Sequence, residues 1–245
     1  MVKGRCFAGN AVIAGASDLI VATSDASLGM GGPAMIAGGG LGDVHPDAVG
    51  PMDTQEPNGN VVVADEAEAV AVTERPLGYF QGDLPDWTAP DQTVLRTAVP
   101  ERARRAYDVA PVIETIADHG TVTFLRPRFA REMVTALARI EGRPVGVIAN
   151  DTRFTAGAIT AAASDKAARF LQLCDAFGLP VVSLIDCPGY MVGPAAPSWS
   201  RWCAGRRECW WRERHFACRW SRWCSGAGTA SGPRRWPAEA CTSRC

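Results

Sequence analysis

The stretch SDKAARFLQLCDAFGLPVVSLID, residues 164–186, decides the fold because a helix signal leads directly into a strand signal. Its apolar residues recur at helical spacing from Phe170 to Phe177, and Gly178 and Pro180 then stop the helix. The apolar run from Val181 to Ile185 has the length of a buried strand. One helix followed by one strand is the repeating unit of an α/β fold.

The same alternation extends outward toward the N-terminus. Ser164 is the predicted N-cap of this helix. Before it, residues 145–149 predict a buried strand and residues 122–125 a short one. Apolar positions between 129 and 140 share one helical face, so we expect a helix there, capped by Gly142. The alternation predicts an α/β fold with mostly parallel sheets.

A similar unit precedes this one. Residues 18–23 predict a buried strand, and Pro33 suits the first turn of a helix. Residues 64–75 predict a longer helix, which we expect Pro76 to end. We therefore expect two units, each built from strands and helices.

The boundary between the two units is expected in a stretch without periodicity. Residues 83–100 are rich in Asp, Thr and Pro and predict a linker. The predicted organisation is a first unit over 1–82, that linker, a second unit over 101–196, and a tail over 197–245 that we expect to lack a native fold.

The tail has a composition of its own. It carries 10 basic residues, all Arg, and 3 acidic ones, against 15 and 23 before it, and it holds 7 of the 8 Trp. Its six cysteines show no Cys-x-x-Cys spacing, so we expect neither a metal site nor a disulfide framework.

The overall composition excludes several classes of protein. The formal net charge is −1, which gives no reason to expect a nucleic-acid partner. No apolar run is long enough to cross a membrane, and the start lacks a secretory signal. Three isolated cysteines before the tail fit a cytoplasmic protein.

Three short segments could hold a ligand. Residues 6–11 open a helix whose free N–H groups suit an enolate or thioester oxyanion, although on spacing alone close helix–strand packing explains them better. The glycine-rich run 29–42 lacks the phosphate-binding signatures. Residues 150–157 and 186–190 follow buried strands, where α/β proteins bind ligands. His45 and His119 are isolated, so we expect neither to be catalytic.

Five blocks of the sequence occur in a characteristic order: GRCFAGNA (4–11), GMGGPAMI (29–36), VADEAEAV (63–70), ASDKAARF (163–170) and DCPGYMVGP (186–194). Taken in this order, they resemble one family, the carboxyltransferase (beta) subunit of the biotin-dependent acyl-CoA carboxylases. The resemblance covers Val2 to about Ala196.

The resemblance implies a crotonase-like α/β fold in two incomplete domains, the first binding acyl-CoA and the second carboxybiotin. It implies no metal, a biotin carboxylase or biotin carrier partner, and a dimer whose active site lies between two subunits. Gly9 and Asn10 would be catalytic, as oxyanion-binding backbone amides. The substrate-binding residues would be Ala8, Gly31, Gly32, Gly157, Ala158, Gly189 and Tyr190. Thr152 stands where many members have Pro.

The tail departs from the family in a way that a reading-frame shift explains. Trp has one codon, so shifting the frame forces Trp202-Cys203 and Trp223-Cys224 to Val. The part after Arg219 can then encode a Val-rich strand and the family's second glycine-rich loop. We expect a subunit truncated at both ends and frameshifted near Ala196, which alone would be inactive. The acyl-CoA stays open among acetyl-, propionyl- and methylcrotonyl-CoA, and the alternatives are an inactive remnant or a single crotonase-type hydratase or isomerase.

Overall fold

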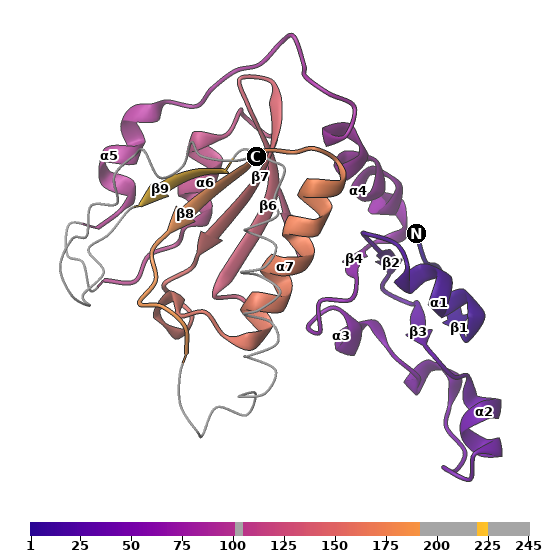
Figure 1. Cartoon of the computed structure of the whole chain (residues 1–245). Helices are drawn as coiled ribbons and strands as arrows, with labels where there is room; N and C mark the ends of the chain where they lie inside the picture. The colour runs from indigo at the N-terminus through magenta and orange to yellow at the C-terminus, as the bar shows by residue number, and fades with distance from the viewer. Residues whose placement is uncertain (101–104, 192–219, 225–245) are drawn as a thin grey trace, which may run out of the picture.

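A computed structural model describes residues 1–100, 105–191 and 220–224, the last of these as a strand only (Figure 1). The elements alternate between strands and helices along most of the chain. The strands are β1 Arg5–Phe7, β2 Val21–Thr23, β3 Ser27–Gly29, β4 Val62–Ala64, β5 Thr123–Leu125, β6 Met133–Ile140, β7 Arg143–Asn150, β8 Val181–Ile185 and β9 Trp220–Cys224. The helices are α1 Gly9–Gly15, α2 Pro33–Gly38, α3 Met52–Gln55, α4 Glu66–Tyr79, α5 Leu95–Ala98, α6 Ala110–Ile116 and α7 Ala161–Ala176, with 3-10 turns at Pro46–Ala48, Gln92–Val94 and Thr155–Gly157.

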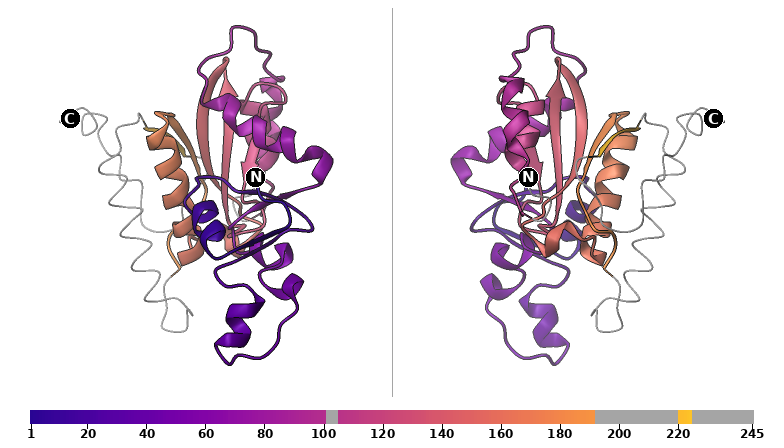
Figure 2. Two further views of the ribbon diagram at one scale, coloured as in Figure 1. Left: turned by 90° about the vertical axis from the view of Figure 1, so that its right-hand side faces the viewer. Right: turned by 90° about the vertical axis from the view of Figure 1, so that its left-hand side faces the viewer.

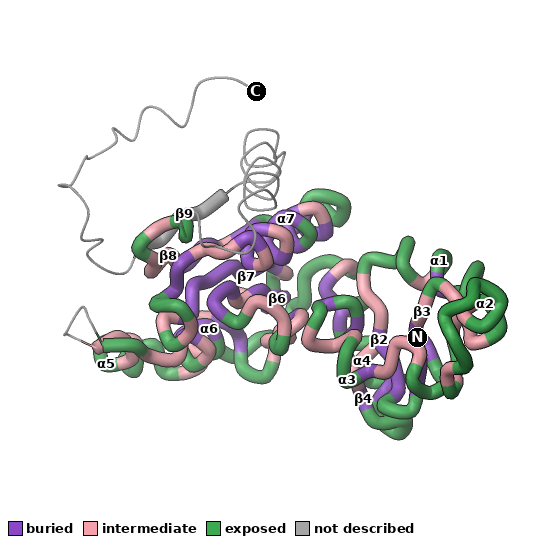
Figure 3. Tube along the Cα trace, turned by 90° about the horizontal axis from the view of Figure 1, so that it is seen from below, coloured by how far each residue is buried: buried purple, intermediate pink, exposed green. Residues whose placement is uncertain are grey.

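The N-terminal half contains two small parallel sheets. Strand β1 pairs with β3, and β2 pairs with β4. The core beneath them is small, and includes Ala22, Met52 and Val61. Figure 3 shows α2 as mostly exposed, and none of its residues is buried.

The C-terminal half is a three-layer structure. Its five-stranded sheet has the order β5-β6-β7-β8-β9. Helix α7 packs on one face through Phe170, Leu171 and Cys174, and α6 packs on the other through Val112 and Ile113. Figure 2 shows α7 beside the sheet in both side views. Because both faces of the sheet are covered, this half holds most of the buried chain.

The sheet is mixed, and this corrects two predictions. Residues 133–140, predicted as a helix, form β6, which runs antiparallel to β5 and β7. Glu141 and Gly142, at φ 52° and 75°, form the tight turn between β6 and β7, so Gly142 does not cap a helix. The helical spacing was misleading because both faces of β6 are buried, which removes the polar–apolar alternation of a strand.

Two helix boundaries also differ from the predictions. Helix α4 continues through Pro76 to Tyr79, whose side chain is buried in the main core. Helix α7 begins after Thr160, whose hydroxyl accepts a hydrogen bond from the Ala163 amide at 3.1 Å, so Ser164 lies inside the helix. The predicted helix at Pro33 and the strand at Val181–Ile185 are confirmed.

The segment 83–100 connects the N-terminal half, with its two small sheets, to the C-terminal half, with its five-stranded sheet. It contains two short helical turns and otherwise crosses the outside of the second half, as Figure 1 shows. The small sheets end before it and the large sheet begins after it. The boundaries predicted around it stay a prediction, and the predicted tail lies outside the described residues except for β9. In the described part of the chain no helix is long and apolar enough to cross a membrane.

Candidate functional site

The first group of predicted site residues lies where β1 and β3 end. These two strands are parallel, so the chain leaves both at the same edge and enters α1 and α2. The Ala8 amide donates to the Gly29 carbonyl at 3.2 Å, which ties the two loops together. Gly32 lies against the Phe7 ring, since a β-carbon there would be 3.4 Å from it. Ala8, Gly9 and Asn10 are therefore neighbours of Gly31 and Gly32.

Gly9 stands in open space. A β-carbon added to it would meet no atom within 4 Å, so close helix–strand packing does not explain this glycine. It opens α1, and Ala8 before it turns the chain with φ 52°. The first turn of a helix leaves its amides without intrahelical partners, and Gly9 and Asn10 are exposed. The local geometry can therefore present backbone N–H groups to a ligand.

A cavity of about 340 Å³ lies beside the same helix. Asn10, Ile13 and Ala14 of α1 line it, together with the chain start and Leu19 and Ile20. Both polar and apolar residues line this cavity, and Asn10 is one of the polar ones. Helix α1 thus faces a cavity along one side, beginning at Asn10.

The second group lies where β7 and β8 end. The loop with Gly157 and Ala158 runs beside the loop with Gly189 and Tyr190: the Ile159 amide donates to the Gly189 carbonyl at 3.0 Å. The backbone amides of Gly157 and Ala158 already donate hydrogen bonds, to the carbonyls of Phe154 and Thr155 at 2.8 and 3.0 Å. This loop has no free pair of N–H groups at those two positions.

Gly157 is required for packing. A β-carbon there would lie 2.6 Å from the Asp186 carbonyl, which holds the two loops in contact. Burial raises the pKa of the Cys187 thiol, and a hydrogen bond from the Gly189 backbone opposes this effect. Thr152, where many members of the family have Pro, accepts a hydrogen bond from the Tyr107 amide at 3.0 Å through its hydroxyl. That contact gives this loop a polar anchor that proline cannot supply.

The two groups are not brought together within one chain. In Figure 1 the ends of β7 and β8 lie on the far side of α7 from α1 and α2. The structure therefore contains two separate half-sites rather than one constellation.

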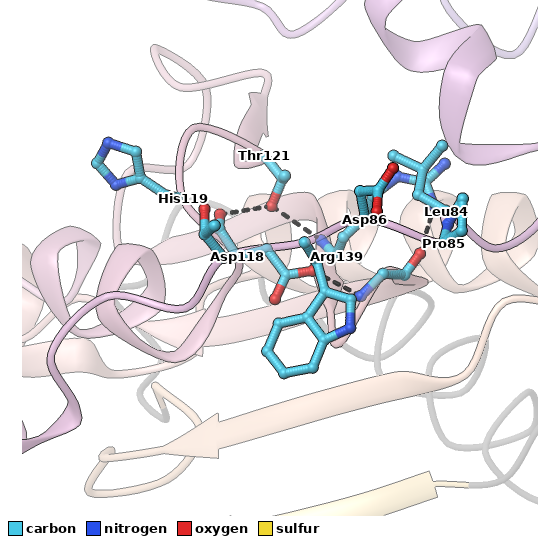
Figure 4. A pocket seen from close by; sticks show the side chains of 10 residues that line it. Leu84, Pro85, Asp86, Asp118, His119, Thr121 and Arg139 are labelled. Atoms are coloured by element: carbon cyan, nitrogen blue, oxygen red, sulfur yellow. Dashed lines mark hydrogen bonds between the residues drawn. The ribbon is translucent and has the colours of Figure 1, made fainter.

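Sequence reasoning missed a cavity of about 490 Å³ (Figure 4). The Arg139 guanidinium, which is buried, donates to the carbonyls of Gly78 and Gly82 at 2.8 and 2.9 Å and to that of Gly142. The buried Asp118 carboxylate accepts from the amides of Glu141 and Gly142 at 3.0 and 2.7 Å. Both charges hold backbone in place, so this cavity is a structural junction between α4, the linker and the β6–β7 turn.

A second overlooked residue is Lys166, which is 2% exposed. Its ammonium group donates to the Phe129 carbonyl at 2.8 Å, and it lines a cavity of about 340 Å³. Burial lowers the pKa of Lys166 to about 8, the nearby Glu132 carboxylate raises it, and the Arg126 charge lowers it further. No sequence signal separates such a lysine from a surface one, since the stripe of α7 that carries it becomes buried only through the fold.

No group of His, Cys, Asp or Glu in the described ranges could hold a metal ion. His119 lies at the rim of the large cavity and His45 at an exposed turn.

A family model for the carboxyl transferase domain matches residues 1–198. The methylmalonyl-CoA carboxyltransferase 12S subunit of Propionibacterium freudenreichii subsp. shermanii is 31% identical over 204 residues, 79% of this chain and 39% of that protein. The biotin-dependent acetyl-/propionyl-coenzyme A carboxylase beta6 subunit of Mycobacterium tuberculosis is 34% identical over 200 residues, 79% of this chain and 42% of that protein. The chain spans about two fifths of the length of these curated relatives.

Solved structures resemble the fold closely. A single-chain, multi-domain long-chain acyl-CoA carboxylase matches 91% of this chain and 23% of its own, with 50% identity and a TM-score of 0.87. The transcarboxylase 12S hexamer, solved with hydrolysed methylmalonyl-CoA, matches 91% of this chain and 46% of its own, with 28% identity and a TM-score of 0.80. The α/β fold is therefore crotonase-like.

Proposed function

Because this chain belongs to the carboxyl transferase domain family, we propose that it is part of the carboxyltransferase component of a biotin-dependent acyl-CoA carboxylase. That component moves a carboxyl group from carboxybiotin to the α-carbon of an acyl-CoA. The reaction needs a stabilised enolate more than it needs ionisable side chains. This requirement fits a site built from backbone amides rather than from a catalytic triad.

The observation that carries the proposal is the open start of α1. Gly9 has no packing partner for a β-carbon, and it lies beside the glycine loop at Gly31 and Gly32. The N–H groups of Gly9 and Asn10 would bind the thioester oxygen as negative charge develops on it. The exposed Ala8 backbone beside them would border the thioester.

The described residues do not provide the matching half for the carboxyl donor. Carboxybiotin supplies the carboxyl group and is expected from a partner carrier. The amides of Gly157 and Ala158 already have carbonyl partners. We therefore assign Gly157, Ala158, Gly189 and Tyr190 to the wall of the site, and place the donor-side amides in the segment altered by the proposed frameshift.

The partners follow from the two half-sites. Since they lie apart in one chain, a complete site would need the second half-site of another subunit, so we propose a dimer-based assembly. A relative of this chain forms a hexamer, which fits an oligomeric enzyme. A biotin carboxylase and a biotin carrier would complete the reaction.

An acyl-CoA titration separates this function from its rivals. The full chain should bind propionyl-CoA by isothermal titration calorimetry and should not hydrate crotonyl-CoA. Hydration of crotonyl-CoA would favour a crotonase-type hydratase. Absence of any acyl-CoA binding by a folded chain would favour an inactive remnant and contradict the assignment of Gly9 and Asn10.

A further inference from the structure

A small cavity lies between the α1–β2 connection and α7, and it shares Ser17 and Leu19 with the cavity beside α1. Its volume is about 160 Å³. One wall is the connection from α1 to β2, which includes Ser17 and Asp18, and the other is α7 with Arg169 and Gln172. Arg126, just after β5, also lines the cavity.

Arg126 makes one hydrogen bond to the protein in this cavity. Its hydrogen bond to the Asp18 carbonyl is long, at 3.5 Å, although a guanidinium carries five N–H donors. Its side chain is partly buried, and its backbone holds an unfavourable φ of 51°. Among the described residues no carboxylate forms an ion pair with Arg126 or Arg169.

The cations here act on one another. Burial and the charge of Arg169 lower the pKa of Arg126 to about 10. The charge of Arg126 in turn lowers the pKa of Lys166, which precedes Arg169 on α7. The neighbouring Glu132 carboxylate is hydrogen-bonded to the Thr160 hydroxyl. A partly buried group of like charges is costly unless a counter-charge joins it.

We propose that the cavity between Arg126 and Arg169 binds a phosphate-type oxyanion. Planar guanidinium groups donate two parallel hydrogen bonds to such an anion. A water molecule occupies about 30 Å³ in the liquid, so the cavity has room for a tetrahedral oxyanion and a few waters, and it excludes a nucleoside. Ser17 and Asp18 line the opposite wall.

The site joins the two halves, so its occupation has a structural consequence. The anion would add a polar link between the α1–β2 connection and α7, where Leu19 already packs against the main core that includes α7 residues. Binding to the folded state alone raises the melting temperature in proportion to the logarithm of ligand concentration. The phosphate could be inorganic or the terminal phosphate of a larger ligand such as coenzyme A.

Thermal unfolding of the full chain tests the proposal. Sodium phosphate should raise the melting temperature above that in sodium chloride of equal ionic strength, and Arg169→Gln should weaken phosphate binding about tenfold. Because Arg169 is exposed, this variant should fold. Arg126→Gln should show the same loss, while Arg143→Gln, at an exposed position on β7, should respond like the unchanged chain.

Two further titrations identify the source of the phosphate. Coenzyme A that competes with inorganic phosphate, where 3′-dephospho-coenzyme A does not, would identify the terminal phosphate as the ligand group. Absence of competition would leave free phosphate as the ligand. An equal phosphate effect in Arg169→Gln and Arg143→Gln, or no effect beyond chloride, would overturn the proposal.

Discussion

At the scale of single residues, two backbone positions in the first half-site have opposite reasons for their small side chains. Gly32 is held near the Phe7 ring, whereas Gly9 faces open space. Residues 6–11 alone favoured packing, because spacing cannot distinguish a glycine that fits a neighbour from one that leaves room. Adding a single methyl group at Gly9 therefore tests whether this half-site binds acyl-CoA.

Gly9→Ala should leave the fold intact and weaken propionyl-CoA binding about tenfold, the loss expected for one obstructed hydrogen bond. Alanine is the better helix residue, so stability should stay equal or rise by about 0.5 kcal/mol. Gly78→Ala in α4 is the matched control, since its added methyl also meets no atom within 4 Å. Calorimetry on both variants gives the comparison, and equal affinity in the two would remove Gly9 from the site.

Lys166 predicts a pH dependence of stability. Its pKa of about 8 in the fold lies below the ordinary 10.5, so its charge destabilises the fold below pH 8, and this penalty disappears as the pH rises toward 10.5. The unfolding free energy of the unchanged chain, relative to Lys166→Met, should rise by up to about 3 kcal/mol between pH 7 and 10. Urea titrations at both pH values measure this difference, and a constant or falling difference would show that the amine is not desolvated.

At the scale of elements, the sequence predicted α7 and β8 because helical spacing, a glycine stop and an apolar run agree over residues 164–186. It missed β6 because Met133–Ile140 is buried on both faces, and period alone cannot then separate a strand from a helix. The decisive signal was the turn at Glu141 and Gly142. Two residues with positive φ between apolar runs specify a hairpin.

The β6–β7 turn should respond in opposite ways to two substitutions. Gly142→Ala should destabilise the chain by about 3 kcal/mol for two reasons. The added β-carbon would lie 2.2 Å from the Leu84 carbonyl oxygen, and the backbone φ of 75° is strained for alanine. Glu141→Asn should stabilise it by about 0.5 kcal/mol, since asparagine tolerates the left-handed region.

Gly178→Ala isolates the backbone strain in that comparison. It has φ 66° but no atom within 4 Å of an added β-carbon, so it should cost about 1 kcal/mol. Denaturant unfolding of Gly142→Ala, Glu141→Asn and Gly178→Ala measures the change in unfolding free energy that each substitution causes. A Gly142→Ala cost no larger than that of Gly178→Ala would show that the contact with the linker is absent.

At the scale of the whole molecule, one buried arginine joins the halves. Arg139→Met would leave the carbonyls of Gly78, Gly82 and Gly142 without this donor and should cost about 3 kcal/mol. Arg143→Met, on the same hairpin but exposed, should change stability by less than about 0.5 kcal/mol. Urea unfolding measures both, and equal costs would contradict this role for Arg139.

Most of the tail predicted from the sequence lies outside the described residues. Strand β9, Trp220–Cys224, lies parallel to β8 at the edge of the large sheet. This is the part of the tail in which the shifted frame predicts a Val-rich strand. The glycine-rich loop predicted after it lies outside the described residues, so the assignment of the donor-side amides to that loop stays a prediction.

Carboxyl transfer is the most direct test of the central claim that this chain holds the acyl-CoA half of a carboxyltransferase without its donor half. The purified chain is assayed with propionyl-CoA and a carboxybiotin donor. It is compared with a version whose tail is restored to the shifted frame and whose N-terminus is extended to the length of its relatives. The restored version should form carboxylated acyl-CoA, and the chain as it stands should form none above background. Comparable turnover by both would contradict the account, because the tail would then be native and the donor half complete.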